Sequence, residues 1–215
     1  DDLLTFQNAS KYTKVDYNGV KDGSVLTYNK NEGYYAAVKG GETNIVITTT
    51  NRSYSNLVIK VIVRDGTEEF PYIIDSEEEL KSIGSQKEGN KFTTSAHYEL
   101  GKSIILTEKW TPIENFTGSI NGAGYTISNM DISKYTDAEI EATKIDNEGT
   151  LVETAKTAAY TEYNTNIALV SAAGLIGNLT IGEDGEVGKI TNLNLKNVNI
   201  NGNFTWSEDW LSENP

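Results

Sequence analysis

The chain has 215 residues, 37% of them hydrophobic, which is enough for one large or two modest domains with cores of their own. Its 31 acidic against 18 basic residues give a net charge of -13, and a surface this acidic repels nucleic acids and anionic lipids. Cysteine is absent, which excludes disulfide bonds, thiol nucleophiles and thiolate metal sites. No stretch approaches the roughly 20 apolar residues of a membrane helix.

The first part of the chain is predicted to be β-structure. Residues 33–41, 44–50 and 57–63 are rich in β-branched and aromatic residues and are bounded by turn formers, so each is predicted to be a strand. The last two of these segments are expected to pair as neighbours through the connection 51–56. These segments together predict an all-β, antiparallel domain. We place its boundary at residues 66–67.

One helix is predicted with clear ends, within "DSEEELKSIG" (75–84). Asp75 or Ser76 is a candidate N-cap, one of the following glutamates can complete a capping box, and Gly84 is a stop signal. Leu80 and Ile83 are the apolar contacts of this helix. It precedes a region in which short strands return.

Residues 126–132 (TISNMDI) and 189–200 (KITNLNLKNVNI) share a pattern that predicts a repeat. Their anchors align at a constant offset of 63 residues, which pairs Ile127 with Ile190 and Asn129 with Asn192. In stacked coils these asparagines would lie at equivalent corners and bond each other, while "NGAG" (121–124) would form a tight turn. The alternative is a pair of unrelated strands of similar composition.

An offset of 63 residues is too long for a single coil of about 20 to 30 residues. Additional coils or an insertion must therefore lie between the two copies. The segment 133–166 is charged and lacks strict alternation, so we predict an insertion there, partly helical around 137–144 and with a turn at "DNEG". Insertions of this kind often carry the binding surface of a repeat protein.

Several of these segments together resemble a known family. "AGLIGNL" followed by "ITNLNLKNVNI" resembles the GLUG motif of bacterial surface proteins, with Ile176 in place of the usual aromatic residue. Upstream, "EEELKSI", "HYELGKSIILTEKWTPI" and "FTGSINGAGYTISNM" resemble the leading section of the same solenoids. The resemblance covers roughly 70–202. It implies a right-handed parallel β-helix over 67–215 with an N-terminal capping helix.

Residues 1–66 resemble the later part of a group 2 bacterial immunoglobulin-like domain. The matching run is Gly33, Ala37-Val38, Gly41 and Thr43 with its following isoleucines, closed by "LVIKVIV". The usual opening strands are missing or shortened. The resemblance therefore implies an incomplete β-sandwich with an open sheet edge that could pair with a second copy. The two ends of the sequence suggest an excerpt of a longer surface protein.

Candidate catalytic and metal-binding groups are few. His97 is the single histidine and is interpreted as structural, and no nucleophile-elbow or P-loop pattern occurs. Acidic turns at 16–23 (DYNGVKDG) and 182–186 (GEDGE) offer oxygen ligands, but neither has the spacing of an EF-hand loop. We expect no cofactor, with Ca²⁺ as the one ion left open.

The C-terminal segment offers a further candidate site, in which two indoles flank two acids. Trp206, Glu208, Asp209 and Trp210 form an aromatic and acidic patch that resembles a sugar platform. Adjacent residues of a strand point to opposite faces, which argues against Glu208 and Asp209 acting as a catalytic pair. The alternative is that these aromatic residues cover the next coil or the end of the solenoid.

These observations predict a non-enzymatic module of a secreted or cell-wall-attached bacterial surface protein. It would act as a spacer and as an adhesin-like scaffold, with the insertion 133–166 recognising a glycan or protein of a host or a neighbouring cell. Nucleic acid and membrane are not expected partners. The alternative is a non-catalytic or substrate-binding part of a larger polysaccharide-active or peptidase surface enzyme.

Overall fold

The computed structural model describes residues 3–5, 13–16, 25–29, 31–32, 34–49, 57–144, 154–167 and 173–201, and only the backbone of 3–5, 13–16, 46–49 and 57. By its internal contacts the chain divides into two compact units, residues 1–73 with 96–99 and residues 74–95 with 100–215. The described part is mostly β, as predicted, with short strands and three helices. None of these helices is long and apolar enough to cross a membrane.

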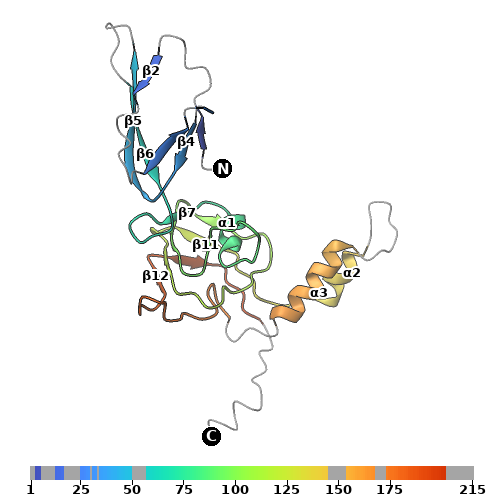
Figure 1. Ribbon diagram of the computed structural model, residues 1–215. Helices are drawn as coiled ribbons and strands as arrows, with labels where there is room; N and C mark the ends of the chain where they lie inside the picture. The colour runs from blue at the N-terminus through green and yellow to red at the C-terminus, as the bar shows by residue number, and fades with distance from the viewer. Residues whose placement is uncertain are drawn as a thin grey trace. The chain divides into compact units, whose positions relative to one another are not determined.

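The first unit holds two three-stranded antiparallel sheets (Figure 1). One has the order β1-β4-β3, and the other has the order β2-β5-β6. The bounds of these strands are β1 Leu3–Thr5, β2 Thr13–Asp16, β3 Leu26–Asn29, β4 Tyr34–Ala37, β5 Gly41–Thr49 and β6 Leu57–Val63.

The predicted strands of this unit are confirmed with small shifts. β6 has the predicted bounds and pairs antiparallel with β5 in a register that places Ile45 opposite Ile59. β5 begins earlier than predicted, at Gly41, and β4 covers only part of 33–41. Leu26 and Tyr35 from one sheet and Ile45 from the other form a buried cluster, so side chains of both sheets contribute to one small core.

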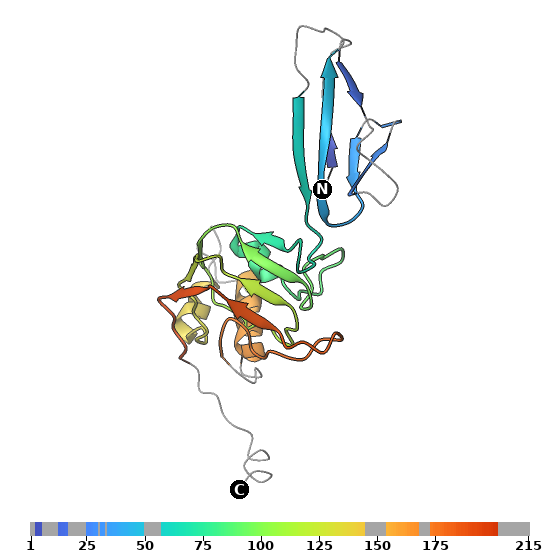
Figure 2. The same cartoon turned by 90° about the vertical axis from the view of Figure 1, so that its left-hand side faces the viewer.

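From residue 72 onward the chain forms two further sheets, in which β10 with β12, β11 with β13 and β9 with β11 pair in parallel. Most residues of β7 and β8 belong to the first compact unit, and the later strands belong to the second. A four-stranded sheet has the order β12-β10-β8-β7, and a three-stranded sheet has the order β13-β11-β9. Figure 2 shows these strands as a stack that runs from β7 in teal to β12 and β13 in red. The bounds are β7 Tyr72–Ile74, β8 His97–Leu100, β9 Ile104–Ile105, β10 Ser119–Asn121, β11 Thr126–Ser128, β12 Lys189–Thr191 and β13 Asn194–Lys196.

From β8 onward the chain winds round the stack in successive passes, each of which adds one strand to each sheet. The number of residues between paired positions differs from one pass to the next. Ile104 pairs in parallel with Ile127, 23 residues later, and Ile127 pairs with Leu195. The second pass is longer because it contains two helices and a small hairpin closed by Ile181 and Val187. Alternate side chains of each pass point inward, so Ile104 and Ile127 are almost fully buried.

The predicted pairing of anchors at a constant offset of 63 is wrong for both strands. Ile127 pairs with Leu195 rather than Ile190, and Ile190 pairs with Ile120. The offset of 63 holds elsewhere, where Ile113 bridges Ile176 and Phe116 bridges Leu179. Each pass contains several strand ends at which an asparagine turns the backbone, so two different corners have similar sequences.

Helix α1 (Glu77–Ser82) confirms the predicted helix and its signals. The Ser76 hydroxyl accepts the Glu79 N–H at 3.1 Å, and Gly84 ends the helix with a φ of +75°. The Glu77 carboxylate accepts the backbone N–H of Thr107 at 3.0 Å and its hydroxyl at 2.7 Å. These bonds join the helix to the chain that leads to residue 110.

The insertion contains two helices that lie side by side, α2 (Asp137–Ala142) and α3 (Ala155–Ile167) (Figure 1). Thr136 and Glu139 form the capping box of α2, where helix was predicted. The longer α3 was not predicted, because its apolar residues do not follow a helical period. Instead, hydroxyl groups join the helices, with Thr157 buried and its Oγ1 2.7 Å from that of Thr143. The predicted turn at 146–149 lies outside the described residues.

Candidate binding site

The site begins at the corner formed by residues 110–113, "WTPI". Trp110 is 1% exposed, and its indole N–H donates to the Leu175 carbonyl at 3.1 Å. The Ile113 N–H donates to the same carbonyl at 3.2 Å, and the Gly177 N–H donates to the Ile113 carbonyl at 2.9 Å. The corner and the segment "GLIG" (174–177) therefore hold each other in place across two passes of the chain.

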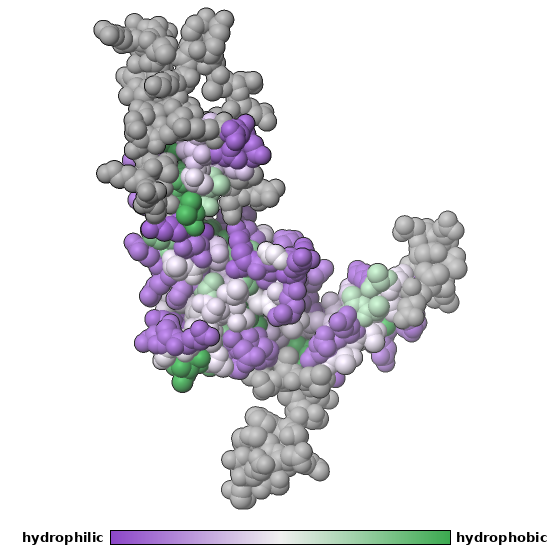
Figure 3. Space-filling model, in the orientation of Figure 1, coloured by the Kyte–Doolittle hydropathy of each residue, from purple (hydrophilic) through white to green (hydrophobic). Residues whose placement is uncertain are grey.

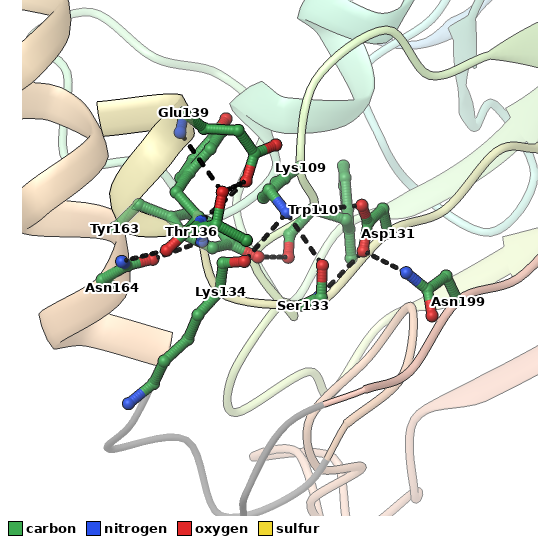
Figure 4. A network of polar contacts seen from close by, with 11 residues as sticks. Lys109, Trp110, Asp131, Ser133, Lys134, Thr136, Glu139, Tyr163, Asn164 and Asn199 are labelled. Carbon is green, nitrogen blue, oxygen red and sulfur yellow. Dashed lines mark hydrogen bonds and ion pairs between the residues drawn. The ribbon is translucent and has the colours of Figure 1, made fainter. Parts of the chain in front are cut away.

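Next to this corner, Lys109 links the pass to the start of the insertion (Figure 4). Its ammonium group donates to the Ser133 hydroxyl at 2.8 Å and to the Lys134 carbonyl at 3.1 Å, and lies 3.5 Å from the Asp131 carboxylate. Burial would raise the pKa of Asp131, but hydrogen bonds from Ser133 and the charge of Lys109 outweigh it and lower that pKa. Lys109 and Asp131 therefore form an ion pair, and we call this group of contacts the Lys109 anchor.

Three tyrosines of the insertion gather over this anchor. The rings of Tyr135 and Tyr160 stack with centroids 3.5 Å apart, and Tyr163 meets Tyr135 edge-on at 5.3 Å. The Tyr163 hydroxyl donates to the Trp110 carbonyl at 2.9 Å, which ties α3 to the corner. Burial and the neighbouring Tyr160 raise the pKa of Tyr135 to about 12, so this hydroxyl stays protonated at neutral pH. The Lys109 ammonium group lies 4.7 Å from the centre of the Tyr135 ring.

A hollow of about 840 Å³ lies between α3 and the passes that carry the corner. That volume is in the range of sites that hold small organic ligands. Its walls combine tyrosine rings, three lysines, two glutamates and amide or hydroxyl groups. The polar and aromatic members that determine its binding chemistry are Lys81, Glu108, Glu114, Lys156, Tyr160 and Tyr163.

Most charges around the hollow are balanced. Lys81 lies 3.0 Å from the Glu77 carboxylate and 2.5 Å from that of Glu108. Burial would lower the pKa of Lys81, but the two carboxylates outweigh it and raise that pKa. The ammonium group of Lys156 lies 5.4 Å from the centre of the Tyr160 ring. A ligand with little net charge therefore fits these walls better than a strongly charged one.

Glu114 differs from the other charged groups of the hollow. Its Oε1 is shielded from solvent, and no described residue donates a hydrogen bond to it. Burial raises the pKa of this carboxyl group. The shielded oxygen packs against the backbone of Gly177, where any side chain would collide with the carboxylate. The hollow thus contains an acceptor whose hydrogen-bonding capacity is unused within the described part of the chain.

The structure brings together residues that the sequence alone did not select. Trp206, Glu208, Asp209 and Trp210 lie outside the described residues, as do residues 17–23 of the first acidic turn. In the second turn, the Asp184 carboxylate accepts the Glu186 N–H at 2.9 Å, so it supports a local turn. No group of three or more His, Asp or Glu that could hold a metal ion occurs in the described ranges. His97 begins strand β8 and is half-buried.

Comparison with known proteins finds a similarity to a surface protein of an archaeon. The halomucin of Haloquadratum walsbyi (strain DSM 16790 / HBSQ001) is 28% identical over 158 residues, which cover 64% of this chain. The chain spans only 2% of the length of halomucin. No family model matches the chain. No solved structure matches it either.

Proposed function

We propose that the chain is a non-enzymatic binding module of a secreted or cell-wall-attached surface protein. In this proposal residues 1–66 are an immunoglobulin-like spacer, and residues 67–215 are a GLUG-like parallel β-helix whose insertion recognises a glycan of a host or neighbouring cell. The observation that carries it is the hollow lined by tyrosines and balanced charges, held between the insertion and the stacked passes.

The parallel pairing of the second unit supports the β-helix part of the proposal. Ile104, Ile127 and Leu195 lie in one ladder, and Ile120 and Ile190 lie in another, so each pass contributes to more than one sheet. The similarity to halomucin, a surface protein of a halophilic archaeon, is compatible with a surface module. The acidic charge of the chain agrees with an extracellular role without nucleic acid.

The chemistry of the hollow favours a sugar as the ligand. A pyranose ring presents hydroxyl groups at its edge and C–H groups on its faces, and tyrosine rings with nearby hydrogen-bonding groups complement both. Lys156 and Glu108 lie at exposed positions of the walls, where they can bond the hydroxyl groups of a sugar. Because Lys81 and Lys109 are paired with acids, we expect neutral glycans to bind better than polyanionic ones.

The test is a glycan and extracellular-matrix array, probed with the full chain and with a variant in which residues 133–166 are replaced by a short Gly-Ser linker. The point variant Tyr160→Ala removes an aromatic wall. Tyr125→Ala is the matched control, because Tyr125 is 39% exposed and does not line the hollow. Circular dichroism and thermal melting establish that each variant is folded.

We expect glycan binding by the chain and by Tyr125→Ala, with at least a tenfold loss for Tyr160→Ala and for the linker variant. Binding that survives removal of the insertion would contradict the proposed site. Binding to matrix proteins alone would replace the glycan by a protein partner. Cleavage of a polysaccharide by the chain would contradict the non-enzymatic assignment.

A further inference from the structure

A second hollow adjoins the one described above and belongs to the same compact unit. Its volume is about 500 Å³, and it shares four wall residues with the first hollow: Glu108, Lys109, Tyr135 and Tyr160. The two hollows therefore meet at the Lys109 anchor and at the stacked rings of Tyr135 and Tyr160. The remaining walls of the second hollow are formed by Leu106, Thr107, Asn129, Asp131, Glu139 and Asn197.

The carboxylates of the second hollow offer acceptors to a ligand. Hydrogen bonds from the backbone N–H and the hydroxyl of Thr136 lower the pKa of Glu139, and Asp131 is ionised in the Lys109 anchor. Both bonds from Thr136 end on Oε2 of Glu139, at 2.6 and 2.8 Å, so its Oε1 accepts no hydrogen bond from the described residues. These walls therefore suit a ligand with many hydroxyl donors and repel an anion.

Two asparagines add both a donor and an acceptor to the same walls. The Asn197 amide donates to the side-chain oxygen of Asn129 at 3.2 Å, and both residues are exposed. This bond leaves the Asn129 amide and the Asn197 side-chain oxygen without a partner among the residues that the structure describes. A donor and an acceptor at neighbouring positions complement two adjacent hydroxyl groups of a sugar ring.

The tyrosine stack determines how a ligand can pass from one hollow to the other. The rings of Tyr135 and Tyr160 are nearly parallel, at 9°, and their centroids are 3.5 Å apart, so their facing sides cover each other. A ligand that crosses the stack meets ring edges and hydroxyl groups instead. The surface visible in Figure 3 is mainly hydrophilic, which favours a hydroxylated ligand over an apolar one.

We propose that the two hollows form one extended site for a linear chain of neutral sugars, with at least one sugar in each hollow. This inference rests on the proposed function, because it extends the same glycan site. Each hollow alone has the volume of a site for a small ligand, so a ligand that fills both consists of at least two linked units. Linking makes the second contact intramolecular, which raises the affinity of a longer chain.

Isothermal titration calorimetry of the full chain tests the extended site, with β-1,4-linked oligomers of glucose, mannose and N-acetylglucosamine from the single sugar to the hexasaccharide. Asn197→Gly removes an amide of the second hollow and keeps a residue that adopts positive φ. Asn192→Gly is the matched control. Asn197 and Asn192 have φ of +53° and +50°, and each donates to an asparagine of the earlier pass at 3.2 Å, but Asn192 lines neither hollow.

We expect one ligand per chain and an affinity that rises at least about tenfold from the shortest oligomer that binds to the hexasaccharide. The shortest oligomer should occupy the first hollow, which is the larger one. Asn197→Gly should therefore weaken hexasaccharide binding about fivefold, as expected for one lost hydrogen bond, and leave binding of the shortest oligomer unchanged. Asn192→Gly should change neither affinity.

Three results would overturn the extended site and leave a glycan site in the first hollow: equal affinity at all lengths, two ligands per chain, or hexasaccharide binding that Asn197→Gly does not weaken. Absence of binding to every oligomer would instead contradict the proposed function, and the extended site with it.

Discussion

Asparagine has two functions at the corners of the stacked passes. Asn115, Asn129, Asn192 and Asn197 have φ between +50° and +63°, a left-handed conformation that asparagine tolerates better than most residues. Their side chains also bond across passes, as in the pair formed by Asn115 and Asn178. A single residue type thus turns the chain and joins neighbouring layers.

Replacing Asn115 separates the two functions. Asn115→Gly keeps a backbone that allows positive φ but loses the side-chain acceptor, and we expect a loss of about 1 kcal/mol in the free energy of unfolding. Asn115→Ala loses the same acceptor and also lacks the tolerance of asparagine and glycine for the left-handed conformation, which costs about 1 kcal/mol more. Urea unfolding at pH 7 measures both variants. Equal stability of the two would show that backbone conformation contributes little at this corner.

The shielded carboxyl of Glu114 predicts a pH effect. Its folded-state pKa is raised, so the folded state binds more protons than the unfolded state between the two pKa values, and stability falls as pH rises through that window. Glu114→Gln removes the charge, and we expect its melting temperature to exceed that of the parent by about 2–4 °C at pH 7, roughly 1 kcal/mol. The difference should vanish below the unfolded-state pKa.

Glu108→Gln is the control for that experiment, because Glu108 is exposed and its carboxylate pairs with Lys81. Loss of this ion pair should leave stability unchanged or slightly lower. An equal rise of the melting temperature in both variants would indicate a general effect of net charge. In that case the buried oxygen of Glu114 would have no special role.

At the scale of elements, close approach between passes depends on glycine. A Cβ on Gly122 would lie 2.5 Å from the carbonyl oxygen of Asn192 and from the Cα of Leu193, both backbone atoms. Gly124, two residues later, has a φ of +81°, but a Cβ added there would meet nothing within 4 Å. The corner "NGAG" therefore contains one glycine needed for space and one needed for conformation.

Gly122→Ala should push the last pass away from the corner, at a cost of about 1–3 kcal/mol. Gly124→Asn is the matched change, since asparagine accepts positive φ and the space is open. Hydrogen exchange reports the effect at two amides, where residue 124 donates to Asn192 and Asn194 donates to Tyr125. We expect both to lose protection in Gly122→Ala only. Unchanged exchange in that variant would contradict the close packing.

The sequence predicted where strands and helices lie better than it predicted which strands pair. β6 and α1 were predicted because their patterns and end signals are local. The pairing of Ile127 was missed because β10 and β11 lie in one pass and both resemble β12, so β12 was aligned with β11 although it pairs with β10. The offset between passes also grows from 63 residues at Ile113 to 70 at Ile120, because the small hairpin closed by Ile181 and Val187 lies in the later pass. Helix α3 was missed because Tyr160 and Tyr163 pack on a distant corner rather than along an apolar stripe.

At the scale of the molecule, the candidate site could not be predicted as a unit. Its walls come from 81–86, from 108–115, and from Tyr135 and residues 156–163. The first two are joined by long-range contacts of Glu77 with Thr107 and of Lys81 with Glu108, which no local pattern predicts. The sequence pointed to the insertion as a binding surface, which corresponds to one wall of the hollow, and it did not point to the other walls. No sequence pattern pointed to Glu114, because the shielding of its carboxylate oxygen arises from contact with Gly177, which is distant in the sequence.

Net charge leads to a prediction for the whole chain. With a charge of -13 at pH 7, acidic groups repel one another more than the basic groups attract them, and folding brings these groups closer together. Surface ion pairs such as that of Lys60 with Glu42 oppose this only weakly, because both side chains are at least half exposed. Screening should therefore remove more repulsion than attraction.

We expect the melting temperature at pH 7 to rise by about 2–4 °C, roughly 1 kcal/mol, between about 0.01 and 0.3 M NaCl. The control is the same titration near pH 4.5, the isoelectric point of the sequence, where net repulsion is absent and the rise should disappear. Scanning calorimetry at both pH values measures the effect. A fall of the melting temperature with salt at pH 7 would mean that ion pairs such as that of Lys81 with Glu77 outweigh the repulsion, and stability would then depend on local pairing rather than on total charge.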